Sequence, residues 1–215
     1  GQNTFYAQNF SANDTVKNET ASKSVLIDQL RDEIYESEKI RNLGTLRDKL
    51  VFSSGVPESD IMFIGEAPGA DEDKVGKPFV GLAGQLLTKM ISAIDLSRED
   101  VYITNIVPWR PPNNRTPNTE EVLQCLPFVQ KHIDIIKPKI IILLGGTASK
   151  AILATTHGIT KVRGKWHHYK SLKIDQPIPA RAIYHPAYLL RSPENKKIAW
   201  EDLKEIKKMI LKIKK

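Results

Sequence analysis

The run Ile140-Ile141-Ile142-Leu143-Leu144 constrains the fold most strongly, because it contains five apolar residues and no polar position. Such a run is typical of a strand that is covered on both faces, as in parallel sheets. Three other β-rich runs occur at residues 61–64, 101–104 and 182–184, and helical patterns occur at residues 83–94, 120–136, 147–153 and 198–213. This alternation predicts a three-layer α/β domain whose four-stranded, mainly parallel sheet is flanked by helices.

The first 24 residues differ in composition from the rest of the chain. They are rich in Asn, Ser, Thr, Gln and Ala without sustained periodicity, which predicts a disordered tail over residues 1–24. A helix that packs on the domain is expected next, since one helix face collects Val25, Leu26, Leu30 and Ile34. No repeat and no wide linker follow, so residues 25–215 are predicted to form a single domain.

Charge and cysteine usage narrow the class of protein. The 32 basic and 25 acidic residues give a net charge of +7, which favours a polyanionic partner but is also common in proteins without one. No run approaches the roughly 18 apolar residues that span a bilayer, so no membrane anchor is expected. The single cysteine, Cys125, excludes an intrachain disulfide and gives no sign of an oxidising compartment, so a cytoplasmic protein is predicted.

Polar and turn-forming residues follow each of the four predicted strands. Glu66 lies in a Gly-Glu-Ala-Pro-Gly turn after the first strand, Asn105 ends the second, Gly145-Gly146-Thr147 follows the third, and His185 ends the fourth. The carboxyl ends of parallel strands share one edge of a sheet, where ligands bind, so these residues are expected to converge. Taken singly, each also fits a helix cap, a turn or a structural residue.

Four stretches carry a resemblance to a known family. They are Gly65-Glu66-Ala67-Pro68-Gly69 with Glu72-Asp73, Gly76-Lys77-Pro78-Phe79-Val80-Gly81, residues 101–105 with Pro111-Pro112-Asn113-Asn114-Arg115-Thr116-Pro117, and His185-Pro186-Ala187-Tyr188-Leu189-Leu190-Arg191. Together, over residues 48–206, they resemble the family 4 uracil-DNA glycosylases. The resemblance implies the uracil-DNA glycosylase fold, and an enzyme that flips deoxyuridine out of DNA and hydrolyses its N-glycosidic bond in base-excision repair.

The resemblance implies two catalytic residues. Glu66 would position the water and support the cationic sugar, and His185 would donate to uracil O2 as negative charge builds on the leaving base. A related family has an acid at the position of Ala67. The partner of the water therefore stays open, with Asp71 and Asp73 as alternatives.

The resemblance also implies a uracil-binding set made of Gly65, Ala67, Glu72, Phe79 and Asn105. Phe79 would stack on the extruded ring, although a core Phe is the alternative. One amide, that of Asn105, can donate to O4 and accept from N3–H, whereas cytosine presents the reversed pair. Glu72 is a candidate wall against the C5 methyl group of thymine.

One departure from the family concerns its cofactor. Family 4 enzymes usually hold a four-iron, four-sulfur cluster on four cysteines. Here Cys125 matches one ligand position, Trp109 occupies the loop position, and residues 25–52 contain no cysteine. Thiolate ligation needs all four cysteines, so neither a cluster nor another metal is expected, and apolar packing around Trp109 would take the place of the iron.

The predicted DNA contacts are Arg110, Arg115, Gly146, Thr147, Leu189, Leu190 and Arg191. The arginines accompany loops at the strand ends, and free N–H groups at the start of the helix after Gly145 suit a phosphate. Either leucine would wedge into the gap left by the flipped base, or else pack as the start of a helix. The predicted partner is uracil-containing DNA, bound by a monomer.

Two other functions compete with the glycosylase. A DNA-binding protein with weak catalysis would retain the fold after losing the cluster, although intact Glu66, Asn105 and His185 argue against it. A nucleotide-utilising enzyme would cradle phosphate in a glycine-containing turn, but no turn here has the Gly-Lys-Ser/Thr ending of a P-loop.

Overall fold

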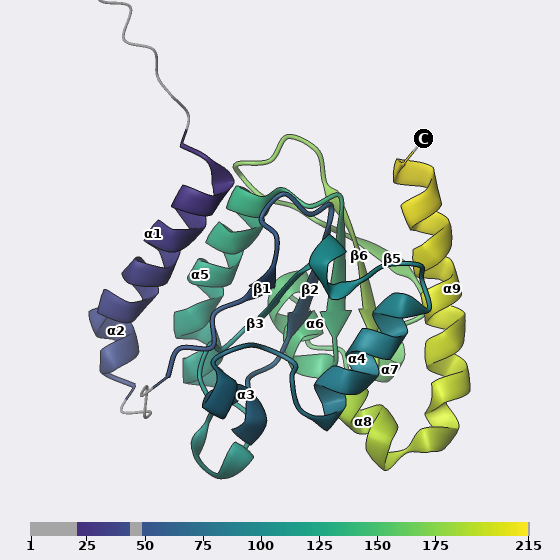
Figure 1. Cartoon of the computed structure of the whole chain (residues 1–215), viewed down its shortest axis with the longest axis horizontal. Helices are drawn as coiled ribbons and strands as arrows, with labels where there is room; N and C mark the ends of the chain where they lie inside the picture. The colour runs from purple at the N-terminus through teal and green to yellow at the C-terminus, as the bar shows by residue number, and fades with distance from the viewer. Residues whose placement is uncertain (1–20, 44–48, 215) are drawn as a thin grey trace, which may run out of the picture.

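The computed structural model describes residues 21–43 and 49–214. Their strands form one six-stranded sheet of order β1-β3-β2-β4-β6-β5 (Figure 1). The central strands are mutually parallel: β2 (Ile61–Gly65), β3 (Tyr102–Asn105), β4 (Ile140–Leu144) and β6 (Ile178–Ile183). These four strands confirm the predicted parallel sheet.

The prediction of only four strands was incomplete, because two short strands extend the sheet. β1 (Ser54–Gly55) and β5 (Trp166–Tyr169) run antiparallel to β3 and β6 at the two edges. β1 has two residues, and β5 is only partly buried, so neither has the continuous apolar run that marks a central strand.

Helices cover both faces of the sheet (Figure 1). They are α1 (Lys23–Glu36), α2 (Glu38–Arg41), α3 (Ala70–Val75), α4 (Leu82–Ser92), α5 (Thr119–Ile136), α6 (Gly146–Leu153), α7 (Ile159–Val162), α8 (Pro186–Arg191) and α9 (Lys196–Ile213), with the short 3₁₀ helices η1 (Arg98–Asp100), η2 (Pro112–Asn114) and η3 (Pro193–Asn195). Within the described residues, no helix combines the length and the apolar character needed to cross a membrane.

Alternate residues of the strands supply two separate hydrophobic clusters. Met62 and Ile64 of β2 pack into the cluster that contains buried residues of α1, α5 and α6. Ile61 and Phe63 pack into the opposite cluster, which contains buried residues of α4 and α9. Because side chains alternate between the faces of a strand, this division explains why β2 and β4 carry no polar side chain at any position.

The predicted N-terminal tail lies mostly outside the described residues. Its last residues belong to α1, which begins at Lys23 after the Ser22 side chain accepts a hydrogen bond from the N–H of Val25. The expected packing of this helix on the domain is confirmed, since α1 lies next to α5 and the Lys23 ammonium donates to the carbonyl oxygen of Ile136 at 2.6 Å. The predicted face was partly wrong, because Val25 is exposed and Ile27 is buried with Leu30 and Ile34.

The parallel pairing continues just beyond the strand ends and brings the following turns together. Gly65 pairs with Asn105 in register, and the N–H of Val107 donates to the carbonyl oxygen of Glu66 at 3.0 Å. The N–H of Gly145 donates to the carbonyl oxygen of Ile183 at 2.9 Å. The turns after β2, β3, β4 and β6 therefore share one edge of the sheet, as expected from the sequence.

Candidate active site

A cavity of about 180 Å³ opens at the carboxyl edge of the sheet. Its lining contains seven of the residues singled out from the sequence: Glu66, Ala67, Glu72, Phe79, Asn105, Arg115 and His185. They come from the end of β3, from the segments that follow β2, β3 and β6, from α3 and from the loop before α4. The cavity therefore gathers groups that are up to 119 residues apart in the chain, the separation between Glu66 and His185.

Asn105 contributes a buried amide to the lining of this cavity. The residue is 3% exposed, and its Oδ1 atom has no hydrogen-bond partner among the described residues. Gly65, its partner across the sheet, makes room for it, because a Cβ at Gly65 would lie 2.4 Å from Oδ1. A buried amide oxygen without a partner is costly, so this atom is poised to accept a hydrogen bond from a ligand.

Phe79 lies against the same glycine. A Cβ at Gly65 would lie 2.5 Å from Cζ of Phe79, and the centre of the ring is 5.6 Å from that of the His185 imidazole. Most of the Phe79 side chain is buried, as expected for the alternative of a core residue. The residue also lines the cavity. The ring can therefore form an apolar wall beside a planar ligand.

His185 is held in one tautomer by the helix that it caps. Its Nδ1 accepts a hydrogen bond of 3.0 Å from the N–H of Ala187 at the start of α8, so the ring proton is on Nε2. Burial lowers the pKa of His185 to about 4, with a further contribution from Arg191 and an opposing one from Glu72. At neutral pH the imidazole is uncharged, and Nε2–H is available as a donor.

Glu66 is oriented by a residue that follows a different strand. Thr147, the second residue of α6, donates from its hydroxyl to Oε2 of Glu66 at 2.5 Å. The other candidate carboxylates lie on α3 and are not among the residues that line the cavity; Asp73 instead pairs with Arg110 at 3.9 Å. Of the three acids considered from the sequence, Glu66 is the one that lines the cavity.

Glu72 has a role that the sequence did not indicate. Its carboxylate accepts hydrogen bonds from the N–H groups of Gly69 at 3.1 Å and of Val80 and Gly81 at 2.8 Å. The residue lines the cavity, as expected for a wall, but these three bonds also tie the turn after β2 to the loop before α4.

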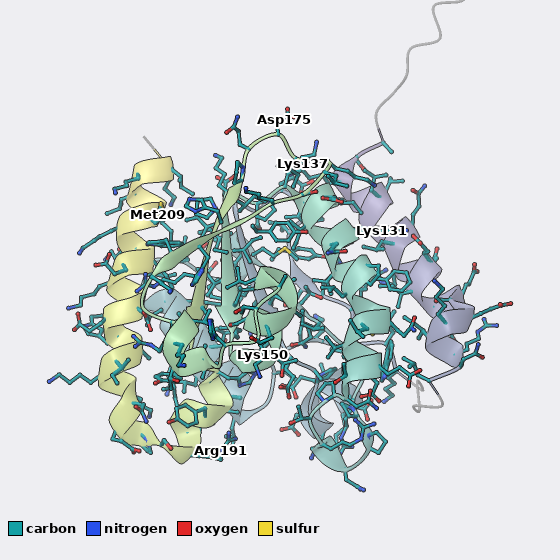
Figure 2. The ribbon with its side chains drawn as sticks, turned by 180° about the vertical axis from the view of Figure 1, so that it is seen from behind. Lys131, Lys137, Lys150, Asp175, Arg191 and Met209 are labelled. Carbon is teal, nitrogen blue, oxygen red and sulfur yellow. The ribbon has the colours of Figure 1, made fainter. Side chains whose placement is uncertain are left out.

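The predicted wedge is divided between two leucines that face different ways. Leu190 is 41% exposed on α8, whereas Leu189 is 1% exposed and belongs to the hydrophobic cluster shared with α4 and α9. The assignment of Leu189 to DNA contact was therefore wrong, because successive residues of a helix point in different directions and this one faces the core. Arg191, next to Leu190, is exposed at one end of the molecule (Figure 2).

The other predicted cations already have protein partners. Arg115 forms two hydrogen bonds, of 2.8 and 2.7 Å, with the buried carboxylate of Glu121, and Arg110 donates to the Asn114 side chain at 2.6 Å. Both lie in the loop between β3 and α5. At the start of α6, a Cβ at Gly146 would meet nothing within 4 Å, so the backbone there is open to a ligand.

Four features of the site were missed from the sequence. They are the Thr147–Glu66 hydrogen bond, the tautomer set by Ala187, and the contributions of Pro111 and Asn114 to the cavity wall. The His-Pro-Ala pattern could have indicated the second, since His185 precedes a proline at the first position of a helix. The others depend on contacts between loops, which no local pattern encodes.

The residues of this chain do not fit an iron–sulfur cluster. Cys125, its one cysteine, is buried, and burial raises the pKa of the thiol to about 12, which disfavours the thiolate that binds iron. Trp109 is 1% exposed in the same hydrophobic cluster as Cys125. No group of three or more His, Cys, Asp or Glu side chains among the described residues could hold a metal ion.

The parallel sheet, the cavity at its carboxyl edge and its polar lining agree with the comparisons with known proteins. Residues 52–204 match the model of the uracil DNA glycosylase superfamily, and the chain belongs to that superfamily. A type-4 uracil-DNA glycosylase of Sulfurisphaera tokodaii is 43% identical over 190 residues, which cover 86% of this chain and 85% of that protein. A type-4 uracil-DNA glycosylase of Thermotoga maritima is 42% identical over 195 residues, which cover 85% of this chain and 97% of that protein. The resemblance to family 4 is confirmed.

This chain also resembles a small part of a larger protein of a different kind. A DNA polymerase of Bacillus phage SP01 is 31% identical over 165 residues, which are 75% of this chain but 17% of the polymerase.

Proposed function

We propose that this protein excises uracil from DNA by hydrolysing the N-glycosidic bond of a flipped deoxyuridine. The observation that carries the proposal is the unpartnered amide of Asn105, which lies in one cavity with the Phe79 ring and the neutral imidazole of His185. Uracil carries an N–H donor next to a carbonyl acceptor, which is the complement of one primary amide. The similarity to type-4 uracil-DNA glycosylases supports the same activity.

The chemistry needs a leaving group that can carry negative charge. When the C1′–N1 bond breaks, its electron pair goes to the base, and Nε2–H of His185 donates to O2 of the departing uracil. A neutral donor held in place suits this task because its orientation costs nothing during the reaction. The Ala187 N–H provides that orientation through Nδ1.

The second half of the reaction is the attack of water on the cationic sugar. Glu66 holds the water, accepts one of its protons as the new C1′–O bond forms, and stabilises the positive charge on the sugar. Thr147 occupies one carboxylate oxygen, Oε2, and leaves Oε1 for the water. The reaction proceeds without an iron–sulfur cluster, in keeping with the single buried cysteine.

DNA binding completes the proposal. Leu190 and Arg191 contact the strand next to the flipped base, and the open backbone at Gly146 and Thr147 receives a phosphate. Arg115 lines the cavity, and Arg110 lies in the same loop between β3 and α5, from which both contact the DNA backbone. The monomeric state, the cytoplasmic location and the single domain over residues 25–215 remain predictions.

A single-stranded oligonucleotide with one uracil and a fluorescent end tests the function. Incubation followed by alkali should cut the strand at uracil and leave matched cytosine and thymine strands intact. Glu66→Ala and His185→Ala should each lower the single-turnover rate by roughly 10² to 10⁴ and keep affinity for uncleaved uracil DNA within about tenfold. Asn105→Ala should also weaken discrimination against cytosine, whereas the exposed Asn42→Ala should not.

Two outcomes would contradict this assignment. If Glu66→Ala and His185→Ala are folded by circular dichroism and still cleave at the wild-type rate, the catalytic centre lies elsewhere. If the wild-type protein binds uracil DNA without cutting it, the weakly catalytic DNA-binding protein becomes the better description.

A further inference from the structure

The backbone at Phe79 adopts a conformation that a bulky residue rarely accepts. Its φ is +55°, in the left-handed region, where non-glycine side chains crowd the backbone. Such strain persists only where the surroundings determine the conformation. The contacts that hold this residue therefore decide where its ring lies.

A guanidinium from outside the cavity holds the carbonyl side of this turn. Arg98, the first residue of η1, donates from Nη1 to the carbonyl oxygen of Phe79 and from Nη2 to that of Pro78, both at 2.8 Å. Nη2 also lies 3.2 Å from the Ser54 hydroxyl. Arg98 is half-buried and is not among the residues that line the cavity. Its hydrogen bonds reach the lining at the Phe79 carbonyl oxygen, and its charge also interacts with that of Glu72.

An opposite charge holds the other side of the same turn. The next two N–H groups, of Val80 and Gly81, donate to Oε1 of Glu72 at 2.8 Å. Four backbone groups within residues 78–81 are thus bound by one cation and one anion. Helix α4 blocks a third direction, because a Cβ at Gly84 would lie 2.0 Å from the carbonyl carbon and oxygen of Phe79.

We propose that Arg98 is a positioning residue for uracil excision, which sets the place of the Phe79 ring by holding the strained turn. The inference rests on the proposed function and extends it to a residue remote from the substrate. Without the guanidinium, the carbonyl oxygens of Pro78 and Phe79 lose their common donor and the turn relaxes toward negative φ. The ring then leaves its place beside Gly65 and His185, where a flipped base would stack.

The planar fork of arginine is what this arrangement requires. Two N–H groups in one plane bind two neighbouring carbonyl oxygens at fixed spacing, whereas a lysine ammonium is a point charge that holds them less rigidly. Arg98→Lys should therefore be intermediate between the wild type and Arg98→Ala.

A double-mutant cycle with Phe79 separates positioning from general stability. Arg98→Ala should lower the single-turnover excision rate by roughly 10- to 100-fold, the range expected for loss of one base–aromatic stack. In a Phe79→Ala background the same substitution should change the rate by less than about twofold, because the ring that it positions is gone. Equal losses in both backgrounds would overturn the proposal. Arg41→Ala, an exposed arginine at the end of α2, is the matched control and should keep the wild-type rate in both backgrounds.

A second measurement does not depend on activity. The Phe79 ring lies 5.6 Å from the His185 ring, so the imidazole NMR signals of His185 report its place. Arg98→Ala should shift these signals, and should cause no further shift in the Phe79→Ala background. Unchanged signals in folded Arg98→Ala would refute the proposal. If Arg98→Ala does not fold, Arg98→Lys is measured in its place. An inactive wild type would refute the proposed function alone, and Arg98 would then be judged by the NMR signals.

Discussion

Thr147 and Glu66 are joined by a hydrogen bond of 2.5 Å although they are 81 residues apart in the chain. The contact connects the first turn of α6 with the turn after β2, and therefore bridges the ends of two neighbouring strands. Among the described residues, the acidic side chains that line the cavity are Glu66 and Glu72. The hydrogen bond from Thr147 fixes one carboxylate oxygen of Glu66. The position of the carboxylate thus depends on the packing of a second strand and its helix.

Removal of this hydroxyl should slow catalysis without unfolding the protein. We expect Thr147→Val to lower the single-turnover excision rate by about 10- to 100-fold, as a hydrogen bond to a charged group is worth about 1.5–3 kcal/mol. Thr147→Ser should retain most of the rate because it keeps the hydroxyl. Exposed Thr160→Val on α7 is the control, and a wild-type rate for Thr147→Val would show that Glu66 needs no such support.

Gly65 should tolerate no side chain. Gly65→Ala would place its Cβ 2.4 Å from Oδ1 of Asn105 and 2.5 Å from Cζ of Phe79, so one of these groups must move. We expect a loss of excision of about 10² or more, since displacement of a positioned group by about 1 Å has that scale. Gly158→Ala is the matched control, because a Cβ there meets nothing within 4 Å. Comparable single-turnover rates for the two variants would contradict the described geometry.

The stability of the protein should fall in mild acid because of two buried histidines. Burial lowers the pKa of His132 to about 3 and that of His185 to about 4, below the value of about 6.5 in unfolded chains. At a pH between the folded-state and the unfolded-state pKa, each histidine is protonated in the unfolded chain and neutral in the folded protein. The free energy of unfolding therefore decreases as the pH falls from about 6.5 toward 4.

His132→Leu should weaken this acid sensitivity. Each histidine contributes a slope of up to about 1.4 kcal/mol per pH unit, and the variant removes one of them. Urea unfolding at pH 7.5 and pH 5, followed by tryptophan fluorescence, measures the change, with exposed His157→Gln as the control. An identical pH dependence for wild type and His132→Leu would show that His132 is not buried in its neutral form.

DNA affinity should fall steeply with salt, and Arg191 should account for part of the slope. Arg191→Ala should weaken binding to all sequences by a similar factor and reduce the slope of log K against log salt by about 1, as expected for one phosphate contact. Lys212→Ala removes the same charge from the last turn of α9, whose C-terminal end lies at the opposite end of the molecule from α8 (Figure 1), and should change the slope little. Fluorescence anisotropy at several salt concentrations tests both variants, and equal slopes would remove Arg191 from the DNA path.

Purified protein should be colourless and free of stoichiometric iron. Trp109→Cys should bind no cluster either, because it brings the chain to two cysteines where four are needed. Trp109→Ala should instead lower the free energy of unfolding by about 3–5 kcal/mol, the usual cost of emptying a buried tryptophan site. Iron analysis, optical absorption and urea unfolding decide the matter. One cluster per chain in the wild type would require ligands beyond those described.

Strand composition predicted the parallel sheet, because buried runs such as Ile140–Leu144 leave little alternative. The convergence of Glu66, Asn105 and His185 followed from that topology together with the position of each residue at a strand end. The orientation of Leu189 did not, since a six-residue helix offers too little periodicity to tell its buried face from its exposed one. Arg98 and Thr147 act through contacts between segments that are distant in the sequence. The residues around each of them form no local sequence pattern that would predict such contacts.

The buried amide oxygen of Asn105 places stability and activity in direct conflict at one atom. An unsatisfied buried acceptor costs about 1–3 kcal/mol, a large part of the stability of a small protein. A side chain chosen only for a well-packed core would avoid that cost and would have nothing to offer to the N3–H of a base. The wild-type chain is therefore less stable than its fold permits, and a base with a donor at the right place relieves the deficit on binding. With the role proposed for Asn105, selectivity for such a base would be built into the free protein, before any DNA is bound.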